Sequence, residues 1–251
     1  MPENCPGSKT DIEQHLRKLV ARVRLAEQTY GREPGSVQIL PVSKTRSVQN
    51  LTEVIALGLP GIGNAFGESY LQEAEGKMTQ LAGLDLQWHF IGPIQSNKTQ
   101  AIARLFQWAH SVDRIKIARR LSAQRPAGLP WLNVCLQVNV SGEASKSGVS
   151  LDALPALAEQ VAMLPNLRLR GLMAIPAASG NIATQRAAFA AVRKAFYSQN
   201  FPPAPGRAEP EWDTLSMGMS ADLEAAIAEG ATIVRIGTDI FGPRVPQATV
   251  D

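Results

Sequence analysis

The sequence predicts an α/β protein in which eight parallel strands, each followed by a helix or a polar turn, form a single (β/α)8 barrel. Short β-like segments alternate with amphipathic helical segments along nearly the whole chain. Several of the β-like segments are apolar, as "LRLRGLMAI" is after its first residues, which is typical of strands covered on both faces. A chain of 251 residues also has the usual size of such a barrel.

The elements follow one another in a regular order, each β-like segment leading into a helical pattern. An extra amphipathic helix, residues 11–30, precedes the first strand and is expected to pack near the barrel's end, since only the tail "FGPRVPQATVD" is expected after the eighth strand. The expected strands are residues 37–42, 61–65, 87–91, 108–112, 132–140, 167–175, 213–217 and 232–237. The expected helices are residues 48–57, 70–81, 97–106, 114–124, 151–164, 183–199 and 221–228.

One domain is expected, a TIM-type barrel with an extra N-terminal helix that covers residues 11–251, preceded by a flexible tail at residues 1–10. The Pro- and Gly-rich stretch at 198–213 is interpreted as a long loop, because too little chain follows it for a second core. A doubly wound open sheet remains the alternative, because closure of the sheet cannot be read from one sequence.

Composition excludes several classes of function. The net charge is only +3 and the basic residues are scattered, which argues against a nucleic-acid partner. No signal core or membrane-length apolar run occurs, so a cytoplasmic protein is expected. Cys135 lies in the apolar run "WLNVCLQVNV" and is expected in the core, and His15, His89 and His110 are far apart in sequence, so no metal site is expected.

Lys44 follows the first apolar strand, in "ILPVSKTRS". In a (β/α)8 barrel, functional groups lie at the carboxyl ends of the strands. A lysine there can be partly desolvated, which lowers its pKa and provides a neutral amine that attacks a carbonyl and forms a Schiff base. The alternative is a surface lysine that opens the next loop.

Two loops near the end of the chain have the composition of a phosphate site. The loop after the seventh strand contains Ser216, Gly218 and Ser220 before a helix, and the eighth strand ends at Gly237 and Thr238. Glycines allow backbone N–H groups to approach an anion, and hydroxyls add donors. The alternative is that Ser220 is only an N-cap and Gly237 only a turn residue.

Charged residues beside these loops must be compatible with an anion. Asp222 and Asp239 would repel a phosphate and are therefore expected to point away from it. Arg235 shares a strand face with Gly237, and if that face points inward its guanidinium lies in the barrel mouth. An arginine there can donate to a pyridine nitrogen, or it can be a phosphate clamp or a surface salt bridge.

The first, seventh and eighth strands are neighbours in a closed barrel. The amine of Lys44 would therefore face the two loops predicted to bind a phosphate. This suits a phosphorylated aldehyde, either pyridoxal 5'-phosphate (PLP) or a sugar phosphate.

Several motifs together resemble one family. From about residue 39 to 244 the chain is similar to the PLP homeostasis proteins (the YggS/PROSC family), which have an alanine racemase N-terminal-domain-like fold. The motifs are "LPVSKT", "FGESYLQE", "WHFIGPIQSNK", "HSVDR", "VNVSGEASKSG", "LRGLMAIP", "LSMGMSADLEAAI" and "VRIGTDIFGPR".

The resemblance implies a single barrel that binds PLP without the second domain of alanine racemase. It implies an internal aldimine at Lys44 and a contact of Arg235 with the pyridine nitrogen, and it places Met173 near the cofactor, although a core role fits Met173 equally well. The phosphate would be held by Ser216, Met217 (through its backbone), Gly218, Gly237 and Thr238.

At two positions the resemblance does not decide whether the residue contacts the cofactor. Ser69 stands where the family usually has Asn, so a cofactor contact there is expected to be lost or replaced by water. Lys146 matches a family lysine, but an exposed loop lysine is the other interpretation.

The expected function is PLP binding for intracellular homeostasis by buffering or delivery, with no catalytic residue, apo PLP-dependent enzymes as transient partners and a monomeric state. The alternative is an amino-acid racemase-like PLP enzyme. An arginine at the pyridine nitrogen makes the ring a poorer electron sink, and a racemase needs a second acid/base. Tyr30, Tyr70 and Tyr197 lie in no motif of a catalytic base. A Schiff-base aldolase acting on a sugar phosphate is a third possibility.

Overall fold

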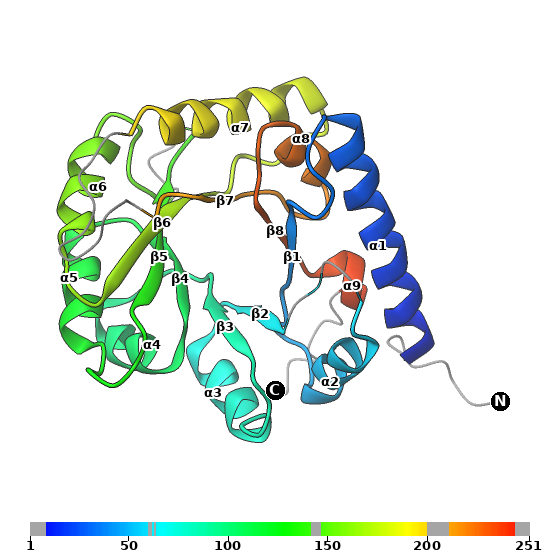
Figure 1. The fold of residues 1–251 in the computed structure, drawn as a ribbon, viewed down its shortest axis with the longest axis horizontal. Coiled ribbons are helices and arrows are strands. Elements are labelled where there is room, and N and C mark those ends of the chain that lie inside the picture. Colours follow the sequence, from blue (N-terminus) through cyan, green and yellow to red (C-terminus); the bar gives the residue numbers. More distant parts are fainter. Residues whose placement is uncertain (1–8, 60–61, 63, 142–146, 200–210, 244–251) are drawn as a thin grey trace, which may run out of the picture.

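The computed structural model describes residues 9–59, 62, 64–141, 147–199 and 211–243. Within these residues a ring of eight parallel strands is surrounded by helices (Figure 1), which confirms the (β/α)8 barrel. The strands are β1 Gln38–Pro41, β2 Ala65–Glu68, β3 Gln87–Phe90, β4 Trp108–Val112, β5 Leu132–Val138, β6 Leu167–Ala174, β7 Thr214–Ser216 and β8 Ile233–Ile236. The helices are α1 Lys9–Thr29, α2 Val48–Leu57, α3 Leu71–Gln80, α4 Thr99–Leu105, α5 Ile115–Gln124, α6 Leu154–Ala162, α7 Ile182–Tyr197, α8 Leu223–Ala228 and α9 Thr238–Phe241, with a 3₁₀ turn at Ser96–Lys98.

The strands pair in the order β1-β8-β7-β6-β5-β4-β3-β2. The ring closes between β1 and β2 through a parallel bridge between Val42 and Gly67 just beyond β1. The backbone N–H of Ser43 donates to the carbonyl oxygen of Gly67 at 3.0 Å beside it. This contact between the ends of β1 and β2, which we call the seam, lies directly before Lys44.

The prediction for the second strand was wrong. It was expected at 61–65, two residues of which lie outside the described part, whereas β2 runs from Ala65 to Glu68 and pairs along its length with β3. Gly67 and Glu68 had the composition of a turn. Glu68 is nevertheless fully buried, because Lys77 on α3 and Ser43 both donate hydrogen bonds to its carboxylate at 2.6 Å. A local pattern cannot reveal such partners.

The two ends of the chain also differ from expectation. A short helix, α9, follows β8 directly, where only a tail was expected. The extra helix α1 begins at Lys9 rather than at residue 11, so Lys9 and Thr10 belong to it rather than to a tail. Residues 1–8 of the predicted tail and residues 200–210 of the predicted long loop lie outside the described residues.

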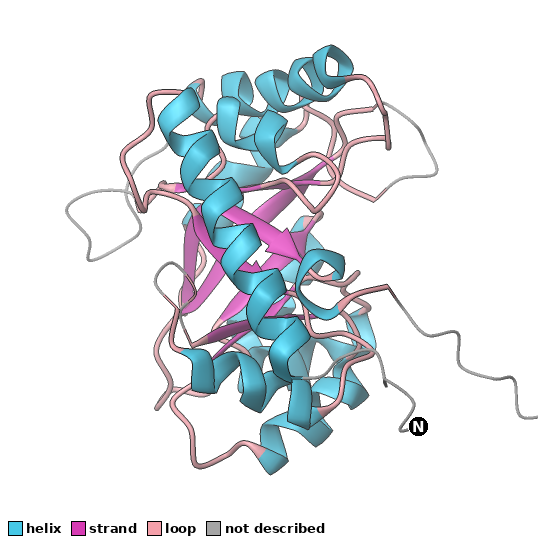
Figure 2. Cartoon of the chain, turned by 90° about the vertical axis from the view of Figure 1, so that its right-hand side faces the viewer, coloured by secondary structure: helices cyan, strands magenta, loops and turns pink. Residues whose placement is uncertain are grey.

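Helix α1 packs along the outside of the barrel against α2, α8 and α9, as the long helix in front of the strands in Figure 2 shows. This position is explained by its apolar stripe, in which residues three or four apart are buried. The stripe consists of Ile12, Leu16, Leu19, Val23 and Ala26. Among the described residues, no helix has the length and apolarity to cross a membrane.

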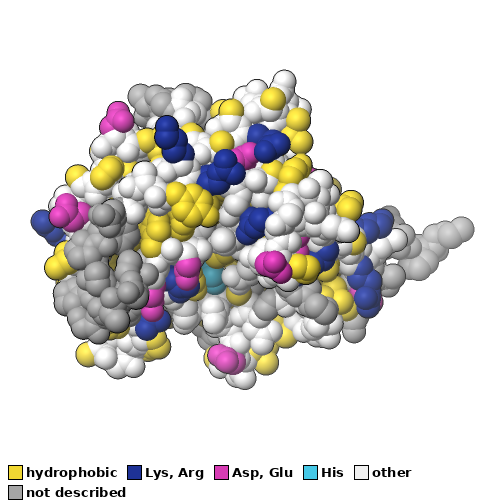
Figure 3. Space-filling model, turned by 45° about the horizontal axis from the view of Figure 1, so that its top comes forward, with side chains coloured by type: hydrophobic (Ala, Val, Ile, Leu, Met, Phe, Trp, Pro, Cys, Tyr) yellow, Lys and Arg dark blue, Asp and Glu magenta, His cyan; other side chains and the backbone are white. Residues whose placement is uncertain are grey.

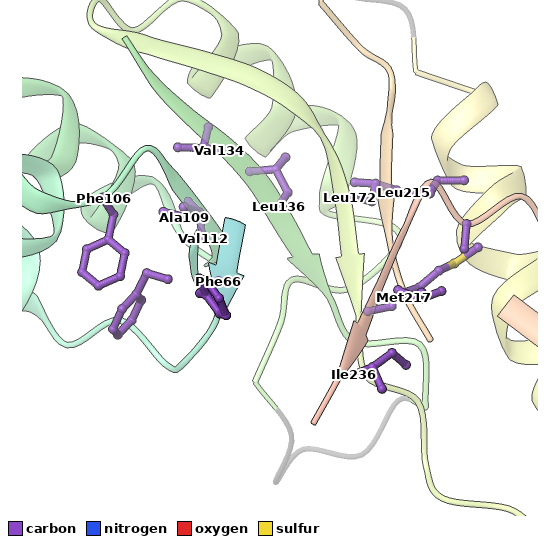
Figure 4. Packing of buried hydrophobic residues seen from close by; sticks show 14 of the residues in the cluster. Phe66, Phe106, Ala109, Val112, Val134, Leu136, Leu172, Leu215, Met217 and Ile236 are labelled. Carbon is purple, nitrogen blue, oxygen red and sulfur yellow. The ribbon is translucent and has the colours of Figure 1, made fainter. Parts of the chain in front are cut away.

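Most of the core lies between the strands and the surrounding helices, as the side chains in Figure 4 illustrate. Alternate strand residues face the barrel interior instead. On β8, Val234 and Ile236 belong to the main core, so Arg235 between them faces inward. On β1, Ile39 faces the helices and Leu40 faces inward, where it packs in a small separate cluster.

Gly171 on β6 is a position where the barrel tolerates no side chain. A Cβ at this residue would lie 1.8 Å from the carbonyl oxygen of Thr214 on β7. We expect Gly171→Ala to lower the free energy of unfolding by about 3 kcal/mol, because the strands would have to separate. Chemical denaturation with unchanged native spectra would measure this loss.

Gly76 provides a matched control, because it lies inside α3 and a Cβ there would meet nothing within 4 Å. Gly76→Ala is expected to raise the free energy of unfolding by about 0.5–1 kcal/mol through its better helix propensity. Equal stability of the two variants would contradict the close β6–β7 approach.

Candidate functional site

The carboxyl ends of the strands surround a cleft of about 310 Å³, which we call the mouth cleft. Five residues predicted from sequence line it: Lys44, Ser69, Arg235, Gly237 and Thr238. The rest of its wall is formed by Val42, Ile91, Ile175, Met219, Ser220 and Ala221. The structure therefore brings together a lysine amine, a guanidinium, hydroxyl groups and a glycine backbone that are separated by up to 194 residues, from Lys44 to Thr238.

Lys44 is half-buried in a tight turn just beyond β1. The next residue, Thr45, has a φ of 64°, a left-handed conformation that is uncommon for a residue other than glycine. The turn therefore sets the direction of the Lys44 side chain, and Lys44 lines the cleft from β1.

Arg235 lies inside the barrel with only 4% of its surface exposed. Its Nη1 donates to both the carbonyl oxygen and the Oγ of Ser216, and its Nη2 donates to the carbonyl oxygen of Ala174 at 3.0 Å. These contacts exclude the surface salt bridge considered from sequence. Burial lowers the pKa of Arg235 to about 10, so its guanidinium remains charged at neutral pH.

Behind Arg235 runs a chain of buried polar side chains. Ser216 Oγ lies 2.8 Å from Nδ1 of His110, and Nε2 of His110 lies 2.9 Å from Nδ1 of His89. Arg235 can only donate to Ser216, but the Ser216 hydroxyl has two lone pairs and can either donate to or accept from Nδ1 of His110, so two directions along the chain satisfy these contacts. In both, the Nε2 of His89 has no partner among the described residues.

Both histidines are held neutral. Burial lowers the pKa of His89 to about 3, and burial, together with the nearby charge of Arg235, keeps the pKa of His110 well below its usual range. His89 also stacks on the Trp108 ring, with centroids 5.2 Å apart. These histidines are distant in sequence, and no sequence motif links them. The available signal was that each stands inside one of two consecutive predicted strands.

The two loops predicted for phosphate meet at one side of the cleft. Gly218 has a φ of 96°, and a Cβ there would lie 2.6 Å from Cβ of Ala226, so only glycine fits. Gly237 and Thr238 line the cleft, as does Ser220. Ser220 is not the N-cap of α8, since its Oγ accepts the backbone N–H of Asp239 at 3.3 Å.

Neither nearby aspartate lines the cleft. Asp239 faces α1, where its carboxylate accepts a hydrogen bond from Arg22 at 2.7 Å. Asp222 accepts the backbone N–H of Met219 at 2.6 Å, and burial raises its pKa. No Asp or Glu is among the described residues that line the cleft, which favours an anionic ligand.

Four predicted residues are not among the described residues that line the cleft: Gly218, Ser216, Met217 and Met173. Ser216 is fully buried behind Arg235. The Met217 side chain belongs to the apolar core (Figure 4), which leaves only its backbone for a ligand. Met173 is buried with Trp108 and Cys135, as expected for a core residue. Lys146 lies outside the described residues.

The face shown in Figure 3 has no continuous basic surface, and the described residues form no metal centre. On the face shown in Figure 3, Lys and Arg side chains are separated by apolar and acidic groups rather than joined in one basic surface. Within the described ranges, no group of three or more His, Cys, Asp or Glu side chains is placed to hold a metal ion. The mouth cleft is thus where the polar groups predicted from sequence converge.

A family model described as "Alanine racemase, N-terminal domain" matches residues 14–245. Among curated proteins, the "Pyridoxal phosphate homeostasis protein" of Pseudomonas aeruginosa is 60% identical over 233 residues, covering 93% of this chain and 96% of the relative. The protein of the same name from Escherichia coli (strain K12) is 46% identical over 244 residues, covering 93% and 97%.

Solved structures give the same result. PipY of Synechococcus elongatus PCC7942, determined "with PLP bound", is 34% identical with a TM-score of 0.70, covering 89% of this chain and 100% of PipY. Alanine racemase from Oenococcus oeni shares the fold at 17% identity and a TM-score of 0.61, and this chain covers 63% of its length. The chain therefore belongs to the pyridoxal phosphate homeostasis protein family, as its motifs indicated.

Proposed function

We propose that this protein binds PLP in the mouth cleft, holds it through a Schiff base with Lys44, and serves in cofactor homeostasis by buffering or delivering PLP rather than by turnover. The observation that carries the proposal is the convergence of Lys44, Arg235 and Thr238 on one cleft, with no carboxylate among the described residues of its wall. The names and titles of the relatives support PLP over a sugar phosphate, and thus over the aldolase interpretation.

The residues of the cleft fit the chemistry of PLP. PLP supplies an aldehyde that condenses with a primary amine and releases one water. Lys44 provides this amine at one wall, while Gly237 and Thr238 at the end of β8 provide backbone and hydroxyl donors for the phosphate. A Cβ at Gly237 would lie 3.3 Å from the carbonyl oxygen of Val42, so this glycine also keeps the junction of β8 with β1 narrow.

We assign Arg235 to the pyridine nitrogen. Three of its five donor hydrogens are used by Ser216 and Ala174, and Arg235 lines the cleft. A charged guanidinium there disfavours protonation of the ring nitrogen, which weakens the ring as an electron sink. Ser216 supports Arg235 from behind, and its predicted contact with the phosphate stays a prediction, as do the contacts of Gly218, Met217 and Met173.

The same cleft gives little support to a racemase. A racemase needs a second acid/base opposite the lysine, and none of the three tyrosines lines the cleft. Tyr30 packs under Arg186, Tyr70 lines a separate pocket, and Tyr197 is 74% exposed. Transient transfer to apo PLP-dependent enzymes, a monomeric state and a cytoplasmic location stay predictions.

Lys44→Ala is expected to abolish the covalent link while leaving noncovalent binding through the phosphate, at least tenfold weaker than in the wild type. Borohydride reduction followed by peptide mass spectrometry measures the link, and equilibrium dialysis measures the remaining affinity. Lys116→Ala, on the exposed side of α5, is the matched control and should keep both. A reduced adduct that persists in Lys44→Ala would refute the assignment.

Arg235→Gln removes the positive charge and keeps hydrogen-bond donors. We expect the apparent pKa of the bound cofactor's ring nitrogen to rise by about one unit or more. Arg235→Lys, which keeps the charge and loses the planar fork, should remain closer to the wild type. Absorbance titration of the three loaded proteins against pH measures these midpoints, and identical midpoints for Arg235→Gln and the wild type would contradict the contact.

Turnover separates binding from catalysis. PLP-loaded protein incubated with single enantiomers of amino acids is expected to release neither the opposite enantiomer nor a keto acid above the rate of free PLP, because none of the tyrosines and no carboxylate of the described residues lines the cleft as a second acid/base. Chiral chromatography follows the reaction. Sustained racemisation that depends on Lys44 would replace the proposed function with the racemase alternative.

A further inference from the structure

A buried charged cluster lies directly behind Lys44, and the proposed function does not use it. Its centre is Lys77 on α3, which is only 4% exposed. The Nζ of Lys77 donates three hydrogen bonds: to the backbone carbonyl of Ser43 at 2.5 Å, to Glu68 at 2.6 Å, and to Glu73 at 2.6 Å. All three ammonium hydrogens are therefore used, so Lys77 is fixed in one place.

The cluster holds the chain on both sides of Lys44. On the N-terminal side, the carbonyl of Ser43 accepts from Lys77, and its hydroxyl donates to Glu68 at 2.6 Å. On the C-terminal side, the backbone N–H of Thr45 donates to Glu73 at 2.6 Å. The same carboxylate oxygen of Glu73 accepts from Lys77, so one ammonium group connects both anchors.

The two anchors act at points where the backbone needs support. Ser43 lies at the seam, where its N–H donates to the carbonyl oxygen of Gly67 across the gap between β1 and β2. Thr45 has the left-handed φ of 64°, which costs free energy unless the surroundings hold it. Without the cluster, the residues around Lys44 would lose both restraints and the lysine would point in several directions.

The charges of this cluster are buried, and this indicates that the cluster fixes a geometry rather than adds stability. Burial raises the pKa of Glu68, and the hydrogen bonds from Lys77 and Ser43 oppose that shift. A buried ion pair of this kind adds little stability compared with apolar packing, and its use is best explained by the geometry that it enforces. The second carboxylate oxygen of Glu68 has no hydrogen-bond partner among the described residues. An unpaired buried oxygen costs further free energy, so stability alone does not account for the cluster.

We propose that Lys77, acting with Glu68 and Glu73, is a positioning residue that aims the Lys44 amine into the mouth cleft before the aldehyde arrives. The inference rests on the proposed function, since it assigns Lys44 as the residue that captures the ligand. Lys77 does not line the cleft among the described residues and acts only through the backbone of Ser43 and Thr45.

The experiment compares capture with noncovalent binding in the full chain. Capture is the rate of Schiff-base formation with PLP, followed by stopped-flow absorbance. Noncovalent binding is measured by calorimetry with pyridoxine 5'-phosphate, which has the same ring and phosphate but no aldehyde. In Lys77→Met, capture should be at least tenfold slower, while the Kd for pyridoxine 5'-phosphate stays within about twofold.

A second variant keeps the test decisive if Lys77→Met does not fold, since that change leaves Glu68 buried without its cation. Glu73→Ala removes the anchor of Thr45 and leaves the Lys77–Glu68 pair in place, so it should fold and also slow capture by about tenfold. Glu75→Ala is the matched control on the same helix, because its side chain makes no hydrogen bond with the described residues. It should match the wild type in both measurements.

Two results would overturn the inference. Capture at the wild-type rate in the folded variants would mean that Lys44 needs no support. An equal loss of capture and of pyridoxine 5'-phosphate binding would mean that the cluster only maintains the cleft. Failure of the proposed function looks different, since wild-type protein would then form no PLP adduct at Lys44.

Discussion

The site depends on how the barrel closes between β1 and β2. Seven neighbouring strand pairs are hydrogen-bonded within the sheet, and the seam completes the ring through the bridge of Val42 with Gly67 and the N–H of Ser43. Lys77 and Glu68 reinforce it from the helix side. A parallel barrel with an open seam would leave strand edges unpaired, and buried backbone groups need partners. The position of Lys44 follows from this closure, because the lysine is the next residue along the chain.

A second group of buried polar side chains stabilises the opposite wall of the barrel. It consists of Arg235, Ser216, His110 and His89, and its composition is explained by which of these groups are charged. Arg235 is surrounded by carbonyl oxygens and by hydroxyl and imidazole groups that are neutral. A protonated histidine beside it would add a second buried cation, and burial instead keeps His110 and His89 neutral. The guanidinium thus carries the net positive charge on this side of the barrel interior and presents its remaining donors to the cleft.

Much of the fold and of the site could be predicted because the deciding signals are local. The apolar run before Lys44, and the glycines and hydroxyls at Gly218 and Thr238, were readable from single segments. What escaped prediction depends on partners distant in sequence. Glu68 was left outside the predicted strand because its cation, Lys77, lies on the next helix, and His89 and His110 meet only after β3 and β4 pair. Sequence shows the residue types, but the pairing of buried charges follows from the register.

The arrangement of the cleft supports the proposed separation of PLP capture from turnover. Capture needs an amine at one wall of the cleft and hydrogen-bond donors for an anion at the other wall. Both groups lie at the carboxyl ends of strands, and the closed ring of strands fixes the positions of these ends. Turnover needs a further acid/base on the exposed side of the ligand. Two of the exposed residues that line the cleft, Ile175 and Met219, are 44% and 38% exposed, and their apolar side chains cannot transfer protons. This exposed part of the cleft wall is consistent with the proposed delivery of PLP.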